Sequence, residues 1–134
     1  MKTEHRPWGT YEVLHAGEGY KVKKIVVNPG QRLSYQYHHK RNEYWTVVSG
    51  NGEVRLNDDF IEVSKDSYIF IPAYSRHTIS NTSKIDPVVF IEIQTGNYFE
   101  EDDIVRLEDD YGRVKTSKWK FLYVLSFKHI YIEW

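Results

Sequence analysis

The sequence contains no cysteine, which excludes disulfide bonds, thiolate metal sites and cysteine nucleophiles. Its formal net charge is only −1, so no excess of either sign favours binding to nucleic acid or to an anionic membrane. No apolar run reaches the roughly 20 residues that a membrane-spanning helix needs. The first residues include no apolar stretch typical of a signal peptide. We therefore expect a cytoplasmic protein whose partners include neither nucleic acid nor a membrane.

A Gly-rich phosphate loop between a strand and a helix is also missing, so we expect no nucleotidyl transfer by these residues alone. Apolar residues make up 40% of the sequence and charged residues 28%, which is the balance of an ordinary globular protein. A chain of 134 residues is long enough to form one domain with its own hydrophobic core.

What the sequence does contain is a series of short runs rich in β-branched and aromatic residues, separated by turn residues. These runs occupy residues 11–15, 20–27, 33–38, 44–48, 53–56, 60–63, 68–71, 77–80 and 88–95. Short strands at this spacing predict an all-β sandwich or closed barrel. The acidic run at residues 100–103 predicts instead the start of a short helix, with its charges solvated in the first turn.

Four polar side chains lie at the ends of these runs. Gln36 and His38 are two residues apart, so on a strand they point to the same face. Glu43 begins the next run and His77 begins a later one. If these strands are neighbours, the four side chains converge and form a donor set for one divalent metal ion. A single histidine on a strand is more often an ordinary core or surface residue, so this inference depends on the whole pattern.

Two stretches of the sequence resemble the two cupin motifs. The residues that match the first motif, with glutamine in place of its usual first histidine, are Gly30, Gln36, His38, Glu43 and Gly50. The residues that match the second motif are Pro72, His77 and Asn81, while Asp66 and Tyr74 stand where it has glycine. The resemblance implies an all-β cupin, which is a double-stranded β-helix or jelly-roll-like barrel. It also implies a bound metal ion, with zinc expected first and manganese, iron, cobalt or nickel as alternatives.

Four further segments indicate one family among the cupins. They are Arg-Pro-Trp-Gly-Thr-Tyr at 6–11, Gln-Tyr-His-His-Lys-Arg at 36–41, Ile-Glu-Ile-Gln-Thr-Gly at 91–96 and Asp-Asp-Tyr-Gly-Arg at 109–113. They are similar to the C-terminal cupin domain of the bifunctional type II mannose-6-phosphate isomerase/mannose-1-phosphate guanylyltransferases. The resemblance covers about residues 6–113 and implies conversion of mannose 6-phosphate to fructose 6-phosphate. In that family residues 36–41 belong to the active site, which implies a catalytic role for Arg41. Lys40 stands where the family usually has a second histidine.

A sugar phosphate needs cationic partners, because its phosphate is a dianion. We expect Arg41 to position the phosphate, and Arg76 and Lys40 to assist it. Lys24 shares a strand face with Val22 and Val26, which predicts that it points inward as a further substrate-binding residue. The alternatives are that Arg76 and Lys40 are solvated loop charges, and that Lys24 protects an edge strand from aggregation.

Glu92 is the candidate catalytic base. Glu92 and Gln94 alternate with Ile91 and Ile93, which places two polar groups on one face of an otherwise apolar strand. A partnered pair inside the barrel is one interpretation, and a half-exposed strand is the other. In the interior position Glu92 would lie close enough to the metal to move a proton.

We interpret residues 1–113 as the cupin domain. Residues 114–134 lie beyond the part of the chain that resembles the family. This C-terminal extension is rich in aromatic and β-branched residues, so we expect it to form a strand that packs on the barrel or in a homodimer interface. Two other functions remain open. A non-catalytic sugar- or metal-binding cupin is slightly favoured by Lys40, whereas a metal-dependent oxygenase is disfavoured by Gln36 in the ligand set.

Overall fold

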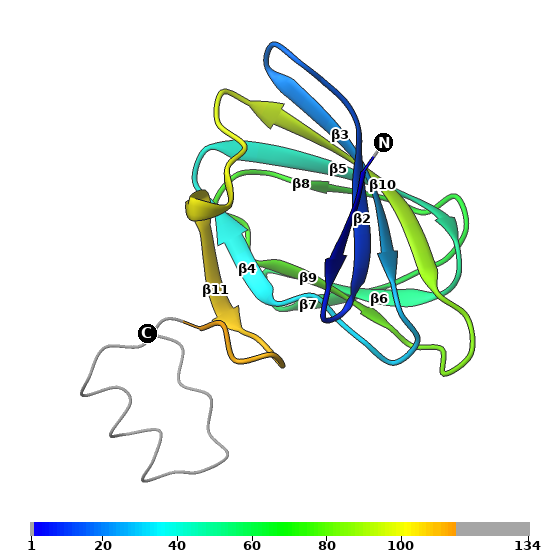
Figure 1. Cartoon of the computed structure of the whole chain (residues 1–134). Helices are drawn as coiled ribbons and strands as arrows, with labels where there is room; N and C mark the ends of the chain where they lie inside the picture. The colour runs from blue at the N-terminus through cyan, green and yellow to red at the C-terminus, as the bar shows by residue number, and fades with distance from the viewer. Residues whose placement is uncertain (1, 115–134) are drawn as a thin grey trace, which may run out of the picture.

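The computed structural model describes residues 2–114, which form two antiparallel β-sheets packed face to face (Figure 1). The strands are β1 (Thr3–Arg6), β2 (Gly9–Gly17), β3 (Tyr20–Val27), β4 (Tyr35–His38), β5 (Arg41–Ser49), β6 (Gly52–Leu56), β7 (Asp59–Val63), β8 (Tyr68–Ile71), β9 (His77–Asn81), β10 (Val88–Gly96) and β11 (Ile104–Glu108). A 3₁₀ turn, η1 (Glu101–Asp103), precedes β11. No helix of residues 2–114 has the length and apolarity that crossing a bilayer requires.

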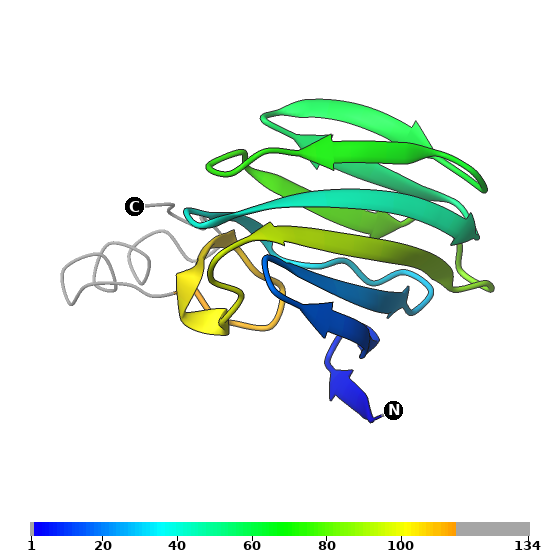
Figure 2. The same ribbon diagram turned by 90° about the horizontal axis from the view of Figure 1, so that it is seen from above.

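The larger sheet has the order β1-β2-β3-β10-β5-β8, and Figure 2 shows its strands β5, β10, β3, β2 and β1 one after another. The smaller sheet has the order β11-β4-β9-β6-β7. Side chains alternate between the two faces of each strand, as β5 shows: Trp45 and Val47 are buried while Thr46 and Val48 are exposed. The buried face of each sheet packs against the other sheet and forms the core, which includes Phe90 of β10.

The predicted all-β class is confirmed, and each of the nine predicted runs falls on an observed strand. The prediction of a helix start at the acidic run is wrong. Glu101–Asp103 is a single 3₁₀ turn, and the chain then continues as strand β11, which pairs with β4. Asp103 is buried rather than solvated, because its carboxylate accepts hydrogen bonds from the backbone N–H groups of His39 and Lys40 at 3.3 and 3.0 Å. These N–H groups need an acceptor in the loop between β4 and β5.

Two glycines of the first motif occupy left-handed backbone conformations and provide a matched pair for a stability test. Gly50 has φ +87°, and a Cβ atom there would lie 2.3 Å from the carbonyl oxygen of Pro87. Gly30 has φ +71°, but a Cβ atom there would meet nothing within 4 Å. Gly30→Ala should therefore lower the free energy of unfolding by about 1–2 kcal/mol, the cost of the left-handed conformation alone.

Gly50→Ala should cost about 1–3 kcal/mol more than Gly30→Ala, because the backbone of β10 must also shift. Urea denaturation of both variants measures the difference. Equal losses in the two variants would contradict the predicted clash at Gly50. Asp66 and Tyr74, which replace the glycines of the second motif, also have left-handed φ values of 73° and 70°. The backbone there keeps this conformation without glycine.

Residues 115–134 lie outside the residues that the structure describes. The predicted strand within residues 114–134, the division of the chain at residue 113 and the homodimer therefore stay predictions.

Candidate metal centre

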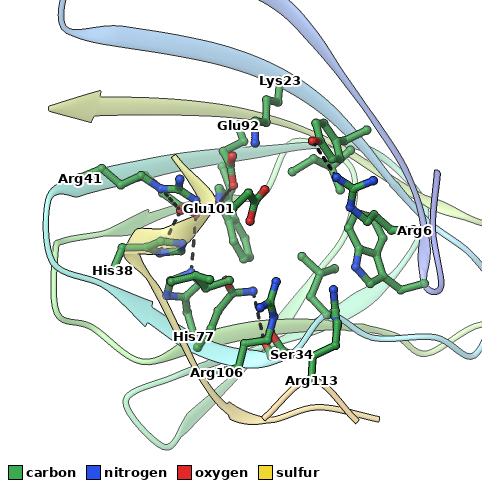
Figure 3. Close-up of a pocket in the computed structure, with 18 residues that line it drawn as sticks. Arg6, Lys23, Ser34, His38, Arg41, His77, Glu92, Glu101, Arg106 and Arg113 are labelled. Atoms are coloured by element: carbon green, nitrogen blue, oxygen red, sulfur yellow. Dashed lines mark hydrogen bonds and ion pairs between the residues drawn. The ribbon is translucent and has the colours of Figure 1, made fainter. Parts of the chain in front are cut away.

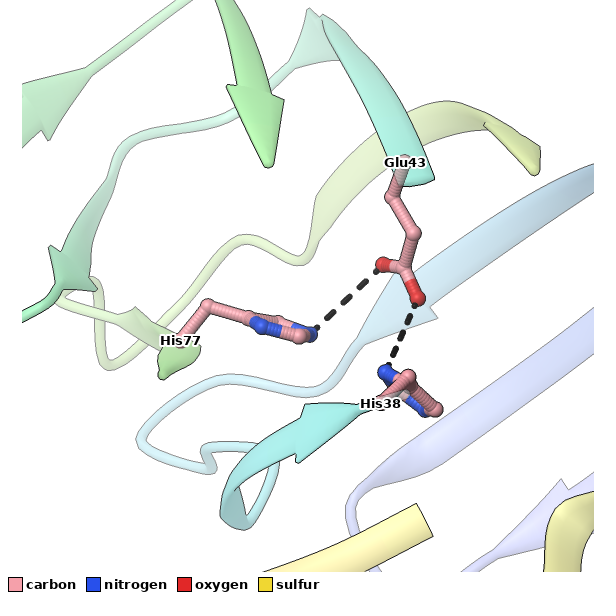
Figure 4. Close-up of side chains that lie close together, drawn as sticks. All are labelled: His38, Glu43 and His77. Atoms are coloured by element: carbon pink, nitrogen blue, oxygen red, sulfur yellow. Dashed lines mark ion pairs between the residues drawn. The ribbon is translucent and has the colours of Figure 1, made fainter. Parts of the chain in front are cut away.

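His38, Glu43 and His77 meet between the two sheets, and each comes from a different strand, β4, β5 and β9 respectively (Figure 4). One potential ligand atom from each residue lies within 4.8 Å of the others. Oε2 of Glu43 is 3.4 Å from Nδ1 of His38, and Oε1 is 3.7 Å from Nε2 of His77. The three side chains are at most 3% exposed. The structure thus brings together three of the four predicted metal ligands in a buried cluster.

Gln36, the fourth predicted ligand, is buried and lines the same cavity as the cluster. It lies directly opposite His77 in the pairing of β4 with β9, which is why two residues far apart in the chain are neighbours here. Its amide nitrogen donates a hydrogen bond to the carbonyl oxygen of Ser34 at 3.3 Å. An amide binds a metal ion through its oxygen, the atom of Gln36 that this hydrogen bond does not use.

The surroundings of both histidines favour the neutral form, which metal ligands require. Nδ1 of His77 lies 2.9 Å from the carbonyl oxygen of Ser75, which can only accept, so Nε2 keeps its lone pair toward Glu43. Nδ1 of His38 is buried and has no hydrogen-bond partner among residues 2–114. Burial lowers the pKa of both histidines, that of His38 to about 3, which favours neutral imidazoles. Two neutral imidazoles, a carboxylate and an amide oxygen fit a divalent ion such as zinc, manganese, iron, cobalt or nickel.

Neighbouring donors orient the Glu43 carboxylate. Arg41 donates from Nε and Nη2 to Oε2, each at 2.9 Å, and Nε1 of Trp45 donates to Oε1 at 3.0 Å. Burial alone would raise the pKa of Glu43, but its neighbours His77, Arg41 and His38 lower it below its usual value. When the two imidazoles are neutral, the guanidinium of Arg41 is the charge that keeps this carboxyl ionised. Arg41 lines the cavity as predicted. Because two of its donors are engaged by Glu43, it is placed to orient this carboxylate.

Glu92 lies on β10 beside the cluster and is buried together with Gln94, so the interpretation of an interior polar pair is confirmed. Nε1 of Trp45 donates to Oε2 of Glu92 at 3.0 Å, so one indole N–H bridges Glu43 and Glu92. Nε2 of Gln94 donates to Oε1 of Glu92 at 2.6 Å. Burial, and then the charge of Glu43, raise the pKa of Glu92 to about 8.

The prediction that Lys24 points inward is wrong, because the neighbouring Lys23 occupies the interior position. Lys23 shares its strand face with Ile25 and Val27, which are 4% and 0% exposed, and it lines the cavity at 7% exposed. Burial lowers the pKa of Lys23. The apolar residues around this part of β3 occupy both faces, so the local sequence does not distinguish the inner face from the outer one.

Lys40 and Arg76 are also outside the cavity, which contradicts the expected proximity of both residues to the site. Lys40 is exposed, and its Nζ lies 4.4 Å from the centroid of the Tyr98 ring. Arg76 is 42% exposed and forms an ion pair with Asp58 at 3.0 Å. Both residues lie in loops, where sequence adjacency to a metal ligand does not determine the direction of the side chain.

Three arginines that the sequence analysis did not single out line the cavity instead: Arg6, Arg106 and Arg113 (Figure 3). Arg6 ends β1 and Arg106 lies in β11, the two strands that the sequence pattern did not predict. Arg106 stands directly opposite Gln36 in the pairing of β11 with β4. No local pattern predicted that these side chains reach the cavity, although Arg6 and Arg113 belong to the segments 6–11 and 109–113 of the family resemblance.

Comparison with known proteins agrees with this fold. Residues 1–109 match the family model described as mannose-6-phosphate isomerase C-terminal. The chain is 47% identical over 110 residues to mannose-1-phosphate guanylyltransferase ManC of Salmonella typhimurium, which covers 82% of this chain and 23% of ManC. It is 47% identical over 109 residues to the alginate biosynthesis protein AlgA of Pseudomonas aeruginosa, covering 81% of this chain and 22% of AlgA. The chain therefore spans less than a quarter of the length of either relative.

Among solved structures, the cupin domain of Schizosaccharomyces pombe Cnp3 superimposes with a TM-score of 0.62. That match covers 66% of this chain and 64% of the Cnp3 domain at 16% identity, and it supports the fold alone. The predicted cupin fold is thus confirmed. The family match covers most of the chain, and the chain belongs to the mannose-6-phosphate isomerase C-terminal family.

Proposed function

We propose that this protein is a metal-dependent sugar-phosphate isomerase that converts mannose 6-phosphate to fructose 6-phosphate. The observation that carries the proposal is the buried cluster of His38, Glu43 and His77 beside Glu92 in one cavity. Family membership supports the choice of substrate. The proposed partner is a small sugar phosphate, and the proposed cofactor is one divalent metal ion.

We assign the residues of the cavity to metal binding, to orientation of a ligand and to proton transfer. Gln36, His38, Glu43 and His77 would hold the metal, and Arg41 would keep the Glu43 carboxylate in position through its hydrogen bonds to Oε2. When bound, a divalent ion would supply Lewis acidity at the carbonyl oxygen of the substrate. The surrounding sheets bury these groups, and electrostatic interactions are stronger where water is excluded.

Isomerisation moves one proton from C2 to C1 while the hydroxyl proton on O2 passes to O1, so the composition of the sugar does not change. Glu92, in its ionised form, is the proposed residue that removes the C2 proton and returns it to C1, because its carboxylate borders the same cavity as the metal ligands. Its pKa of about 8 means that this form gains population as the pH rises above neutral. Lys23 lies directly opposite Glu92 on β3 and is buried. It is placed to hydrogen-bond to a substrate oxygen on this side of the cavity.

A non-catalytic sugar-phosphate-binding cupin is the second candidate. The observation that favours it concerns Lys40, which stands where the related enzymes usually have a second histidine. Lys40 is exposed and does not line the cavity, so it cannot replace an imidazole in the reaction.

The test is conversion of mannose 6-phosphate to fructose 6-phosphate by the full 134-residue chain, before and after treatment with a chelator. We expect turnover in metal-loaded protein, loss of turnover after chelation, and recovery when a divalent metal is restored. Circular dichroism of the chelated protein controls for unfolding, since the core between the sheets does not include the metal ligands. Metal-loaded protein that binds the sugar phosphate without converting it would favour the non-catalytic candidate.

A further inference from the structure

Three guanidinium groups, those of Arg6, Arg106 and Arg113, line the cavity in addition to the candidate metal ligands. Figure 3 shows Arg106 and Arg113 side by side at the edge of the cavity and Arg6 facing them from another wall. They come from β1, from β11 and from the segment that follows β11, so the arrangement exists only in the folded chain. Among residues 2–114, the arginines and lysines that line this cavity are these three together with Lys23 and Arg41.

Arg106, which lines the cavity, has a hydrogen-bond donor without an acceptor. Its Nε is buried and has no hydrogen-bond partner among residues 2–114. A buried donor without an acceptor costs free energy, so such groups in native proteins call for a ligand or another explanation. The positive charge of Arg113 and the negative charges of Glu101 and Asp109 all act on Arg106, and Glu101 also lines the cavity. An anion bound to both guanidinium groups would offset their mutual repulsion. Arg106 is also opposite Gln36, which places it one strand away from the metal cluster.

The other two arginines are held in place by partners that leave part of each guanidinium for a ligand. Nε and Nη2 of Arg113 donate to the two oxygens of Asp109 at 2.7 and 3.0 Å, which fixes its plane and leaves Nη1. Arg6 donates to two neutral groups, the Tyr11 hydroxyl at 3.1 Å and the His5 carbonyl oxygen at 2.9 Å. Its ion pair with Glu4 is long, at 3.9 Å, so its charge is only partly compensated.

We propose that Arg6, Arg106 and Arg113 form the subsite that binds the phosphate of the substrate. This inference rests on the proposed function. A 6-phosphate lies at the opposite end of an open-chain hexose from the reacting carbons, so this subsite would direct C1 and C2 toward the metal cluster and Glu92. Guanidinium groups bind phosphate oxygens through paired, charge-assisted hydrogen bonds. Binding energy from this remote group would position the reacting end of the sugar.

The test uses two variants, Arg106→Ala and Arg6→Gln, which change different sheets, so a folding defect in one leaves the other informative. Inorganic phosphate is titrated calorimetrically into chelator-treated full-length protein, so that a bound metal cannot be the binder. We expect each variant to weaken phosphate binding about tenfold to a hundredfold, the usual effect of losing one charged hydrogen-bonding partner. The KM for mannose 6-phosphate in metal-loaded protein should rise by a similar factor, with an unchanged metal content.

Arg32→Ala is the matched control. Arg32 precedes β4 and forms an isolated bridge with Ser80 of β9. It lies outside this cavity and donates to both oxygens of Asp110 at 2.9 and 2.7 Å. This variant should change phosphate affinity and KM by less than about threefold. Unchanged phosphate affinity in both Arg106→Ala and Arg6→Gln would overturn the subsite, even if the wild-type protein is an active isomerase. Phosphate binding that depends on both arginines, in a protein without isomerase activity, would support the subsite and reject the proposed reaction.

Discussion

Purified His38→Ala protein is expected to contain less than about a tenth of the metal found in the wild-type protein. Altering even the residues that only orient metal ligands typically weakens metal affinity about tenfold to a hundredfold, and removing a ligand should have at least this effect. His38 contributes a neutral imidazole next to the Glu43 carboxylate, and its Nδ1 has no other partner among residues 2–114. Elemental analysis after dialysis, together with competition against a chromophoric chelator, measures the loss.

His39→Ala is the matched control for this experiment. The His39 side chain is 43% exposed, and its ring contacts Tyr37 and Tyr74 with centroids 5.3 and 5.1 Å away. Its substitution should leave the metal content unchanged, although it removes an imidazole from the adjacent position. Circular dichroism should show that both variants keep their strands. If folded His38→Ala protein binds metal with the wild-type stoichiometry, the proposed metal centre is wrong.

Glu92→Gln should lower kcat for mannose 6-phosphate by about a hundredfold to ten-thousandfold, the range typical for loss of a general base. The glutamine side chain has nearly the same shape, and its oxygen can still accept the hydrogen bond that Trp45 donates, while its nitrogen requires the Gln94 amide to turn and accept instead. It cannot carry a proton between C2 and C1. The metal ligands are untouched, so the metal content should stay at the wild-type level. KM should change much less than kcat, because the phosphate contacts are remote from this residue.

Proton exchange provides a readout that a merely structural role for Glu92 would not change. In D₂O, the wild-type protein should incorporate solvent deuterium at C1 of the product whenever the transferred proton exchanges with water, and Glu92→Gln should show almost no incorporation. Glu62→Gln is the control, since Glu62 is an exposed carboxylate on β7. A folded, metal-loaded Glu92→Gln protein with kcat within about threefold of wild type would show that another group moves the proton.

The candidate metal ligands could be predicted from the sequence because their relations are local. Gln36 and His38 share a face through the two-residue period of a strand, and Glu43 follows across a short loop. Placing His77 beside the other three ligands required knowledge of one long-range strand pairing. The resemblance to the second cupin motif predicted this neighbourhood. The nine predicted runs succeeded for the same reason, since each depends only on alternation and on flanking turn residues.

The cationic side of the cavity depends on strand pairing between distant parts of the chain. Arg106 reaches the cavity only because β11 pairs with β4 in the register that sets it opposite Gln36. Arg6 reaches it because the short strand β1 pairs with β2 at the edge of the larger sheet. Neither strand has a strong local pattern, so tertiary contacts decide that these residues are strands at all.

The choice between Lys23 and Lys24 has a related cause. The alternation of a strand predicts that one of two neighbouring residues faces inward. It does not predict which of the two does so when apolar residues occupy both faces. The packing of β3 between β2 and β10 determines which face of β3 points inward, and Lys23 is therefore buried opposite Glu92. Arg41 illustrates the same dependence, because its position in the chain predicted a place at the cavity. The sequence did not predict that the guanidinium of Arg41 would donate to Glu43. The folded structure places the two side chains together, and the buried carboxylate is stabilised by this cation.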